Sequence, residues 1–144
     1  MDRSDSFIKE APRNQELRLL SRKRKTAHAR LLALNSPVYA AFLDMERAAF
    51  ADGRLPKRTK ELVALGISVV LGCESCMQWH LEQAAAAGAE PGEILEALEV
   101  GVEMGGGPAT VSLRLALDVL VDVFGEEGLA QAAHPVAKAP EASG

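Results

Sequence analysis

The stretch that decides the fold is residues 60–80, KELVALGISVVLGCESCMQWH. Its first half is apolar at nearly every position, which predicts a helix from about Pro56 that is buried on all sides and central to the fold. Gly72 and Cys73 then begin a second helix, for which Gly88 is the expected C-cap. The stretch therefore predicts two consecutive helices with a cysteine pair at the start of the second.

The flanking sequence predicts further helices. Ser36 is the expected N-cap and Pro37 the first residue of a helix that follows a break in the chain. Pro91 opens another amphipathic helix, and a Gly-Gly-Gly-Pro turn separates it from a final apolar helix that ends near Phe124. Because no alternating apolar pattern occurs in the sequence, and only 4% of residues are aromatic, we expect an all-α helical bundle.

At 144 residues the chain has room for a single domain with one core. We divide it into a flexible arm at 1–14, a basic amphipathic helix at 15–35, a helical core at 36–124 and a mobile tail at 125–144. His134 lies in that tail, so we expect no bound role for it.

The distribution of charge and apolar residues restricts the partners. Residues 1–30 carry nine Lys/Arg against four Asp/Glu, although the whole chain has a net charge of −4. The basic stretch at 21–25 has no interleaved aromatic residues, so we interpret it as a solvated helix face and expect no nucleic-acid partner. No run reaches the ~18 apolar residues that cross a membrane, and residues 1–25 do not resemble a signal peptide. We therefore expect a cytoplasmic protein whose two cysteines serve chemistry rather than a structural disulfide.

Cys73, Cys76 and His80 stand at positions i, i+3 and i+7, which places them along one stripe of a helix. A cysteine in the first turn lies at the positive end of the helix dipole, where the thiolate is favoured. His80 is placed to accept or return a proton. Such a pair can reduce a peroxide through a sulfenic acid that condenses with the second thiol to a disulfide. An external dithiol must then reduce the disulfide.

Other interpretations of these residues remain open. The cysteines and the histidine can simply be buried core residues. They can also bind zinc, with Glu61 as a fourth ligand, although structural zinc sites usually take their ligands from two separate pairs. Glu61 taken alone is an acidic residue in the first turns of a helix, where it needs no catalytic explanation. A thioredoxin-like fold is excluded because no strand precedes the cysteine motif.

The spacing Glu61, eleven residues, Cys73-x-x-Cys76, three residues, His80 resembles the signature of the alkylhydroperoxidase D-like (AhpD-like) branch of the carboxymuconolactone decarboxylase family. The glycine-rich segment at 101–109 is also similar to a turn of that family. The resemblance covers roughly residues 36–124 and implies an AhpD-like helical bundle that assembles as a trimer or hexamer.

The resemblance also implies roles for the four residues. Cys76 attacks a hydroperoxide substrate, Cys73 resolves the intermediate, and Glu61 and His80 relay the proton. The chain carries Ser75 where some members have a further histidine in the relay. The implied reductant is a lipoyl protein, a thioredoxin-like protein or a small thiol, and no cofactor is needed. The alternative is a non-enzymatic redox-sensing or metal-binding module that uses the same cysteines.

Overall fold

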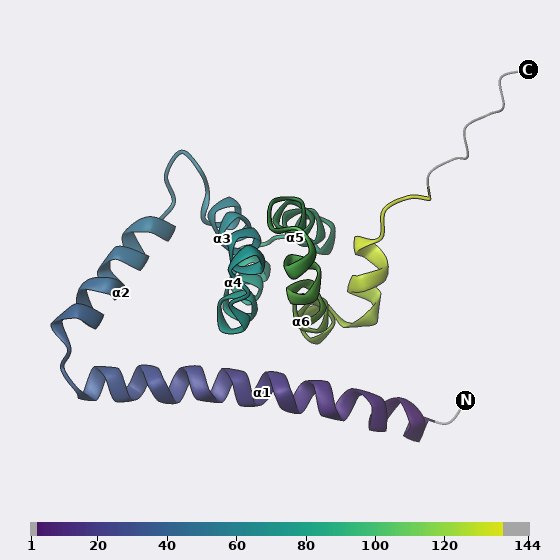
Figure 1. Cartoon of the computed structure of the whole chain (residues 1–144), viewed down its shortest axis with the longest axis horizontal. Coiled ribbons are helices and arrows are strands. Elements are labelled where there is room, and N and C mark those ends of the chain that lie inside the picture. Colours follow the sequence, from purple (N-terminus) through teal and green to yellow (C-terminus); the bar gives the residue numbers. More distant parts are fainter. Residues whose placement is uncertain (1–2, 137–144) are drawn as a thin grey trace, which may run out of the picture.

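The computed structural model describes residues 3–136, with side chains from residue 15 onward. Within those residues the chain forms helices and no strand, which confirms the all-α class. The helices are α1 (Arg3–Ala33), α2 (Pro37–Phe50), α3 (Lys57–Leu71), α4 (Glu74–Ala86), α5 (Pro91–Gly105) and α6 (Gly107–Ala132). Helices α3 to α6 pack together as a helical body, whereas α1 and α2 form an N-terminal helix pair that runs beside it (Figure 1).

Several predicted helix starts and stops are confirmed by their caps, but the C-cap of α4 is Ala87 and not the expected Gly88. Ser36 accepts a hydrogen bond at 3.2 Å from the backbone N–H of Tyr39, and Pro37 is the first residue of α2. Gly72 ends α3 with a φ of +65°, a left-handed conformation that suits glycine. Cys73 is the N-cap of α4, so the cysteine motif lies at a helix start as the sequence predicts.

Helix α3 lies at the centre of the body and packs against α4, α5 and α6. The prediction that it is buried on all sides is wrong, because one of its faces is left uncovered by the other described helices. Val63 and Ile67 on that face are 53% and 54% exposed. Together with residues of α5 they line an open apolar groove of about 520 Å³. Val70, Val100 and Met104 also line this groove.

Helices α3 and α5 approach each other closely where two glycines face one another. A Cβ added at Gly101 would lie 2.6 Å from the backbone oxygen of Gly66. A backbone atom cannot move aside as the end of a flexible side chain can. The core beside this contact is made of apolar side chains from all four helices of the body. Its largest fully buried members include Leu65, Val69, Leu81, Ile94, Leu98, Val119 and Leu120.

We predict that Gly101→Ala destabilises the protein by about 1–3 kcal/mol, because the added methyl group forces α3 and α5 apart. Gly92→Ala in the same helix is the matched control, since a Cβ there meets nothing within 4 Å. Thermal unfolding of both variants should show a loss for Gly101→Ala and an unchanged or slightly higher midpoint for Gly92→Ala. Equal midpoints would contradict the close contact.

Both ends of the chain differ from expectation. The range 1–14 was expected as a flexible arm, yet α1 begins at Arg3. In the expected tail at 125–144, the chain turns at Gly125, whose φ is +74°, and then forms a further helical stretch to Ala132. Residues 1–2 and 137–144 lie outside the described residues.

The short helical stretch after Gly125 packs back against the helical body. Gly128 and Ala132 are buried there, and Gly128 packs beside Phe124 and Pro91. Its sequence of small and acidic residues gave no periodic apolar signal. His134 follows, and its Nε2 lies 2.6 Å from an Oε1 of Glu99 at the surface. None of the described helices has the length and hydropathy that a bilayer-spanning segment requires.

Candidate redox site

A disulfide joins Cys73 and Cys76 at the start of α4, with their Cα atoms 5.2 Å apart. The local backbone explains this placement. The left-handed Gly72 turns the chain out of α3, and the N–H of Cys73 then donates to the carbonyl of Ser68 at 3.1 Å. The N–H of Cys76 lies 3.2 Å from Cys73 Sγ and donates to it as in a side-chain N-cap. The two sulfurs can therefore exchange between thiol and disulfide within a single helical turn.

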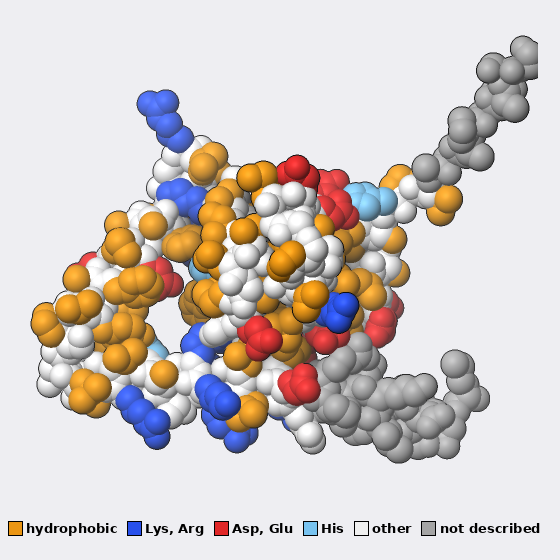
Figure 2. Space-filling model, in the orientation of Figure 1, with side chains coloured by type: hydrophobic (Ala, Val, Ile, Leu, Met, Phe, Trp, Pro, Cys, Tyr) orange, Lys and Arg blue, Asp and Glu red, His pale blue; other side chains and the backbone are white. Residues whose placement is uncertain are grey.

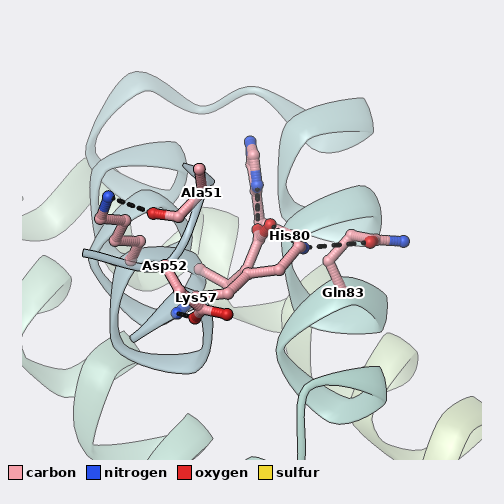
Figure 3. A network of polar contacts seen from close by, with 7 residues as sticks. Ala51, Asp52, Lys57, His80 and Gln83 are labelled. Atoms are coloured by element: carbon pink, nitrogen blue, oxygen red, sulfur yellow. Dashed lines mark hydrogen bonds and ion pairs between the residues drawn. The ribbon is translucent and has the colours of Figure 1, made fainter. Parts of the chain in front are cut away.

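Glu61 is a buried carboxylate, only 2% exposed, that is held by two partners from different helices. Its Oε1 accepts from Lys57 Nζ at 2.8 Å, and its Oε2 lies 2.7 Å from His80 Nδ1. Because a buried charge is costly unless it is paired, this double contact accounts for a carboxylate inside the body. Figure 3 shows Lys57, His80 and Gln83 gathered in this network of polar contacts.

The contact with Glu61 also decides which nitrogen of His80 is free. When the carboxylate is ionised it can only accept, so His80 Nδ1 carries the proton and Nε2 keeps a lone pair. The ring of Phe50 stacks on that of His80, with centroids 5.2 Å apart and an angle of 23° between the planes. The imidazole is thus fixed on one side by a hydrogen bond and on one face by an aromatic ring.

The loop between α2 and α3 anchors Lys57. The backbone N–H of Lys57 donates to Asp52 Oδ1 at 2.7 Å, and Lys60 Nζ donates to the carbonyl of Ala51 at 2.6 Å, as drawn in Figure 3. Lys57 Nζ also lies 3.4 Å from Gln83 Oε1 on α4. These contacts hold the lysine against Glu61, so the ammonium group belongs to the same network as the histidine.

A cavity of about 720 Å³ opens beside this network, between α4 and the N-terminal helix pair. Cys76 and His80 line it, whereas Cys73 does not. Most of its remaining wall is apolar or aromatic. Figure 2 shows a hollow between the N-terminal helix pair and the body, with hydrophobic side chains around it and Lys and Arg side chains at its lower edge. Of the two cysteines, Cys76 is therefore the one that lines a space for a substrate.

Arg24 joins the N-terminal helix pair to the body at the edge of the cavity. Its guanidinium donates to Gln78 Oε1 at 3.2 Å, lies 3.6 Å from Glu82 Oε2 and stands 4.9 Å above the ring of Trp79. Burial raises the pKa of the Glu82 carboxyl, and the positive charge of Arg24 acts in the opposite direction. The buried Gln78 further donates to the carbonyl of Leu17 at 2.9 Å. One polar junction thus positions α1 over α4.

The structure brings the four predicted site residues together in two pairs. Cys73 is bonded to Cys76, and Glu61 is hydrogen-bonded to His80. These contacts differ from those of a zinc site, where thiolates and imidazole point to one common centre. Within the described part of the chain, no group of three or more His, Cys, Asp or Glu side chains is arranged to hold a metal ion.

Sequence reasoning missed Lys57 and Phe50. Lys57 stands four residues before Glu61, and this i, i+4 spacing of opposite charges is a signal that could have identified it. Phe50 gave no such signal, because it reaches His80 from a helix 30 residues away in the sequence. The cavity could not be predicted either, since it depends on how α1 and α2 stand relative to α4.

The fold and the site define an all-helical protein with a cysteine pair at a helix start and a buried Glu–His pair beside it. The family model for the carboxymuconolactone decarboxylase family matches residues 36–118, more than half of the chain. The chain therefore belongs to the carboxymuconolactone decarboxylase family, which confirms the resemblance read from the sequence.

The chain is also similar to individual proteins and solved structures. Protein 4 of the cox locus of Paracoccus denitrificans, itself uncharacterised, is 40% identical over 85 residues, which are 59% of this chain and 77% of its own. The apo structure of a family member from Legionella pneumophila is 29% identical with a TM-score of 0.70, and the match covers 78% of this chain and 96% of that one.

A family member from Thermotoga maritima is 33% identical with a TM-score of 0.60. The match covers 64% of this chain and 95% of that protein, for which an involvement in the antioxidative response has been suggested.

Proposed function

We propose that the protein is a thiol-dependent peroxidase and disulfide reductase that reduces organic hydroperoxides through Cys73 and Cys76. The observation that carries this proposal is the shared wall of one cavity. Cys76 and His80 both face that space, and His80 is tied through Nδ1 to the buried Glu61. Nucleophilic attack by a thiolate requires a thiol, a base and a group that stabilises the protonated base.

The catalytic cycle begins with both cysteines reduced. His80 Nε2 takes the proton from Cys76, and the resulting imidazolium is stabilised by Glu61. The thiolate attacks the terminal oxygen of the hydroperoxide, the O–O bond breaks, and the departing alkoxide takes a proton from His80 to become an alcohol. Cys76 is then a sulfenic acid. The Cys73 thiol gives up its proton as its sulfur attacks that of Cys76, the displaced hydroxide takes up a proton and leaves as water, and the disulfide forms.

The cycle closes with a dithiol reductant, whose two thiols become a disulfide as Cys73 and Cys76 return to thiols. Overall, one hydroperoxide and one external dithiol give an alcohol, water and an external disulfide. A lipoyl protein, a thioredoxin-like protein or a small thiol has the required chemistry. No step needs an organic cofactor.

A coupled peroxidase assay with an organic hydroperoxide and each class of reductant tests the proposal. We expect steady turnover with at least one dithiol donor, accompanied by formation of the Cys73–Cys76 disulfide. If the disulfide forms once without turnover, the protein is a redox-sensing module instead. If neither cysteine reacts and the purified protein holds stoichiometric zinc, the peroxidase proposal fails in favour of a metal-binding module.

We also propose that the chain works as a homo-oligomer of at least three copies, a trimer or a hexamer. The support is the apolar groove between α3 and α5, where exposed side chains such as Ile67, Val100 and Met104 gather. Large exposed apolar patches are usual at interfaces between subunits. A second copy of this chain would remove that surface from water.

Sedimentation velocity at micromolar concentration should therefore show a species of three chains or more. Ile67→Lys should shift it toward smaller species, because a charge would be buried in the interface. Val123→Lys is the control, since Val123 is exposed on α6 outside the groove. A wild-type chain that sediments only as a monomer would contradict the prediction.

A further inference from the structure

The charged residues that line the site cavity are divided between two of its walls. Arg24, Lys25 and His28 come from α1, whereas Glu46, the only acidic residue among the described lining residues, comes from α2. An anion in the cavity is therefore attracted toward α1 and repelled from α2. The wall of the cavity that α1 forms is therefore positively charged, and the wall that α2 forms is negatively charged.

Of the three basic residues, Lys25 is the one without a close charged partner among the described residues, and its charge acts on the Glu82 carboxyl only from beyond ion-pair distance. Arg24 is engaged with Gln78 and Glu82, and His28 Nδ1 lies 2.5 Å from the hydroxyl of Tyr39. Lys25 is exposed and forms no ion pair with any residue that the structure describes. An ammonium group on a flexible stem at the edge of a cavity can bind the anionic end of a ligand.

The rest of the cavity is suited to an apolar ligand body. Leu31, Leu43 and Phe42 line it from the N-terminal helix pair, and Phe50 and Trp79 lie nearer to His80. Its volume of about 720 Å³ lies within the usual range of ligand pockets, roughly 300–1,000 Å³. Hydrogen peroxide would leave nearly all of this apolar wall in contact with water.

We propose that this cavity binds amphipathic carboxylates, and that hydroperoxides of apolar carboxylic acids are the substrates of the Cys76 site. The carboxylate pairs with Lys25 on α1, the hydrocarbon chain lies against the aromatic wall, and the hydroperoxide group reaches Cys76 and His80 on α4. The substrate assignment rests on the proposed peroxidase function. The binding assignment does not, because it concerns only the walls of the cavity.

Binding can be measured without any redox reaction, since Trp79 is the only tryptophan of the chain and lines the cavity. Dodecanoate and dodecanol, both below their micelle or solubility limits, should each be titrated against the full chain while Trp79 fluorescence is recorded. We expect dodecanoate to bind about fivefold more tightly than dodecanol, the scale of one exposed ion pair. The preference should shrink in high salt.

Three variants make the assignment specific. Lys25→Gln should remove the preference for dodecanoate and leave dodecanol binding unchanged. Lys23→Gln is the matched control, because Lys23 is an exposed neighbour on α1 that does not line the cavity. Ala27→Phe, on the cavity wall, should weaken both ligands by filling the space. Equal affinities for acid and alcohol in the wild type, or equal effects of the two lysine variants, would overturn the proposal.

Turnover separates this inference from the proposed function. We expect kcat/KM for a long-chain carboxylic acid hydroperoxide to exceed that for its methyl ester by about fivefold, and to do so only while Lys25 is present. Turnover of acid and ester at equal rates would overturn the substrate assignment and leave the peroxidase function standing. Tight, Lys25-dependent binding of dodecanoate with no turnover of any hydroperoxide would refute the peroxidase function and leave the binding site standing.

Discussion

Cys76→Ser is expected to abolish hydroperoxide turnover, with a loss of three orders of magnitude or more, roughly the scale for removal of a nucleophile. Cys73→Ser should also stop steady turnover, but for a different reason. In that variant the attacking thiol remains and only its resolving partner is missing. One equivalent of hydroperoxide should therefore leave Cys76 as a sulfenic acid that dimedone traps, and mass spectrometry of the labelled peptide measures it.

The asymmetry between the two cysteines follows from their surroundings. Cys73 is the N-cap residue, and its sulfur accepts the N–H of Cys76, which stabilises negative charge on it. That argument alone would make Cys73 the faster nucleophile. However, only Cys76 lines the cavity with His80, and a nucleophile needs both access to the peroxide and a proton acceptor. A cysteine whose thiolate is stabilised but which does not line the cavity is suited to the resolving role.

Ser75→Ala is the control for the cysteine variants, because Ser75 also lines the cavity and lies between the two sulfurs in sequence. It should change turnover by only a few fold. Faster dimedone labelling of Cys73 in Cys76→Ser than of Cys76 in Cys73→Ser would reverse the assignment of the two roles.

Glu61→Gln is expected to slow peroxide reduction by about 10²-fold or more, the usual scale for loss of general acid–base assistance. The substitution keeps the shape of the side chain and removes its negative charge. The imidazolium formed when His80 takes the Cys76 proton then loses its anionic partner, and Lys57 loses its counter-charge. Single-turnover oxidation of the reduced protein should show the loss directly, because it is independent of the reductant.

Two further variants distinguish a role in catalysis from a role in folding. Glu74→Gln removes an exposed carboxylate from the first turn of α4 and should leave the rate of oxidation unchanged. Lys57→Gln removes the cation beside Glu61 but keeps the carboxylate, so its effect should be smaller than that of Glu61→Gln. If Glu61→Gln lowers only the unfolding midpoint and leaves the rate intact, Glu61 is a structural residue.

The helix boundaries at the start of α2 and between α3 and α4 were predictable because they depend on neighbouring residues. Ser36 and Pro37 at the start of α2, and Gly72 and Cys73 between α3 and α4, act through capping and backbone conformation within one turn. The pairing of Glu61 with His80 was implied by the family resemblance, since nothing in the local sequence distinguishes Glu61 from an ordinary acidic residue near a helix start.

Features that join distant segments could not be predicted in the same way. The contact of Arg24 with Gln78 joins residues 54 positions apart and leaves no periodic pattern in either helix. The exposed face of α3 was misread for a related reason. An apolar face that packs against another subunit has the same residue pattern as a face that is buried within its own chain, because both faces are removed from water when they are covered. Hydropathy records that a face is apolar and does not record what covers it.

The hydrogen bond from the Cys76 N–H to Cys73 Sγ couples electron transfer to the stability of α4. In the oxidised protein the acceptor is a neutral disulfide sulfur. After reduction, a thiolate at the same position accepts the N–H as a charge-assisted bond, which is roughly twice as strong. Such a bond shifts the balance toward the reduced state, relative to a cysteine pair that lacks it. In the proposed cycle, the pair is therefore expected to accept electrons more readily than the same two cysteines away from a helix start, and a dithiol donor of only moderate reducing power should suffice to regenerate it.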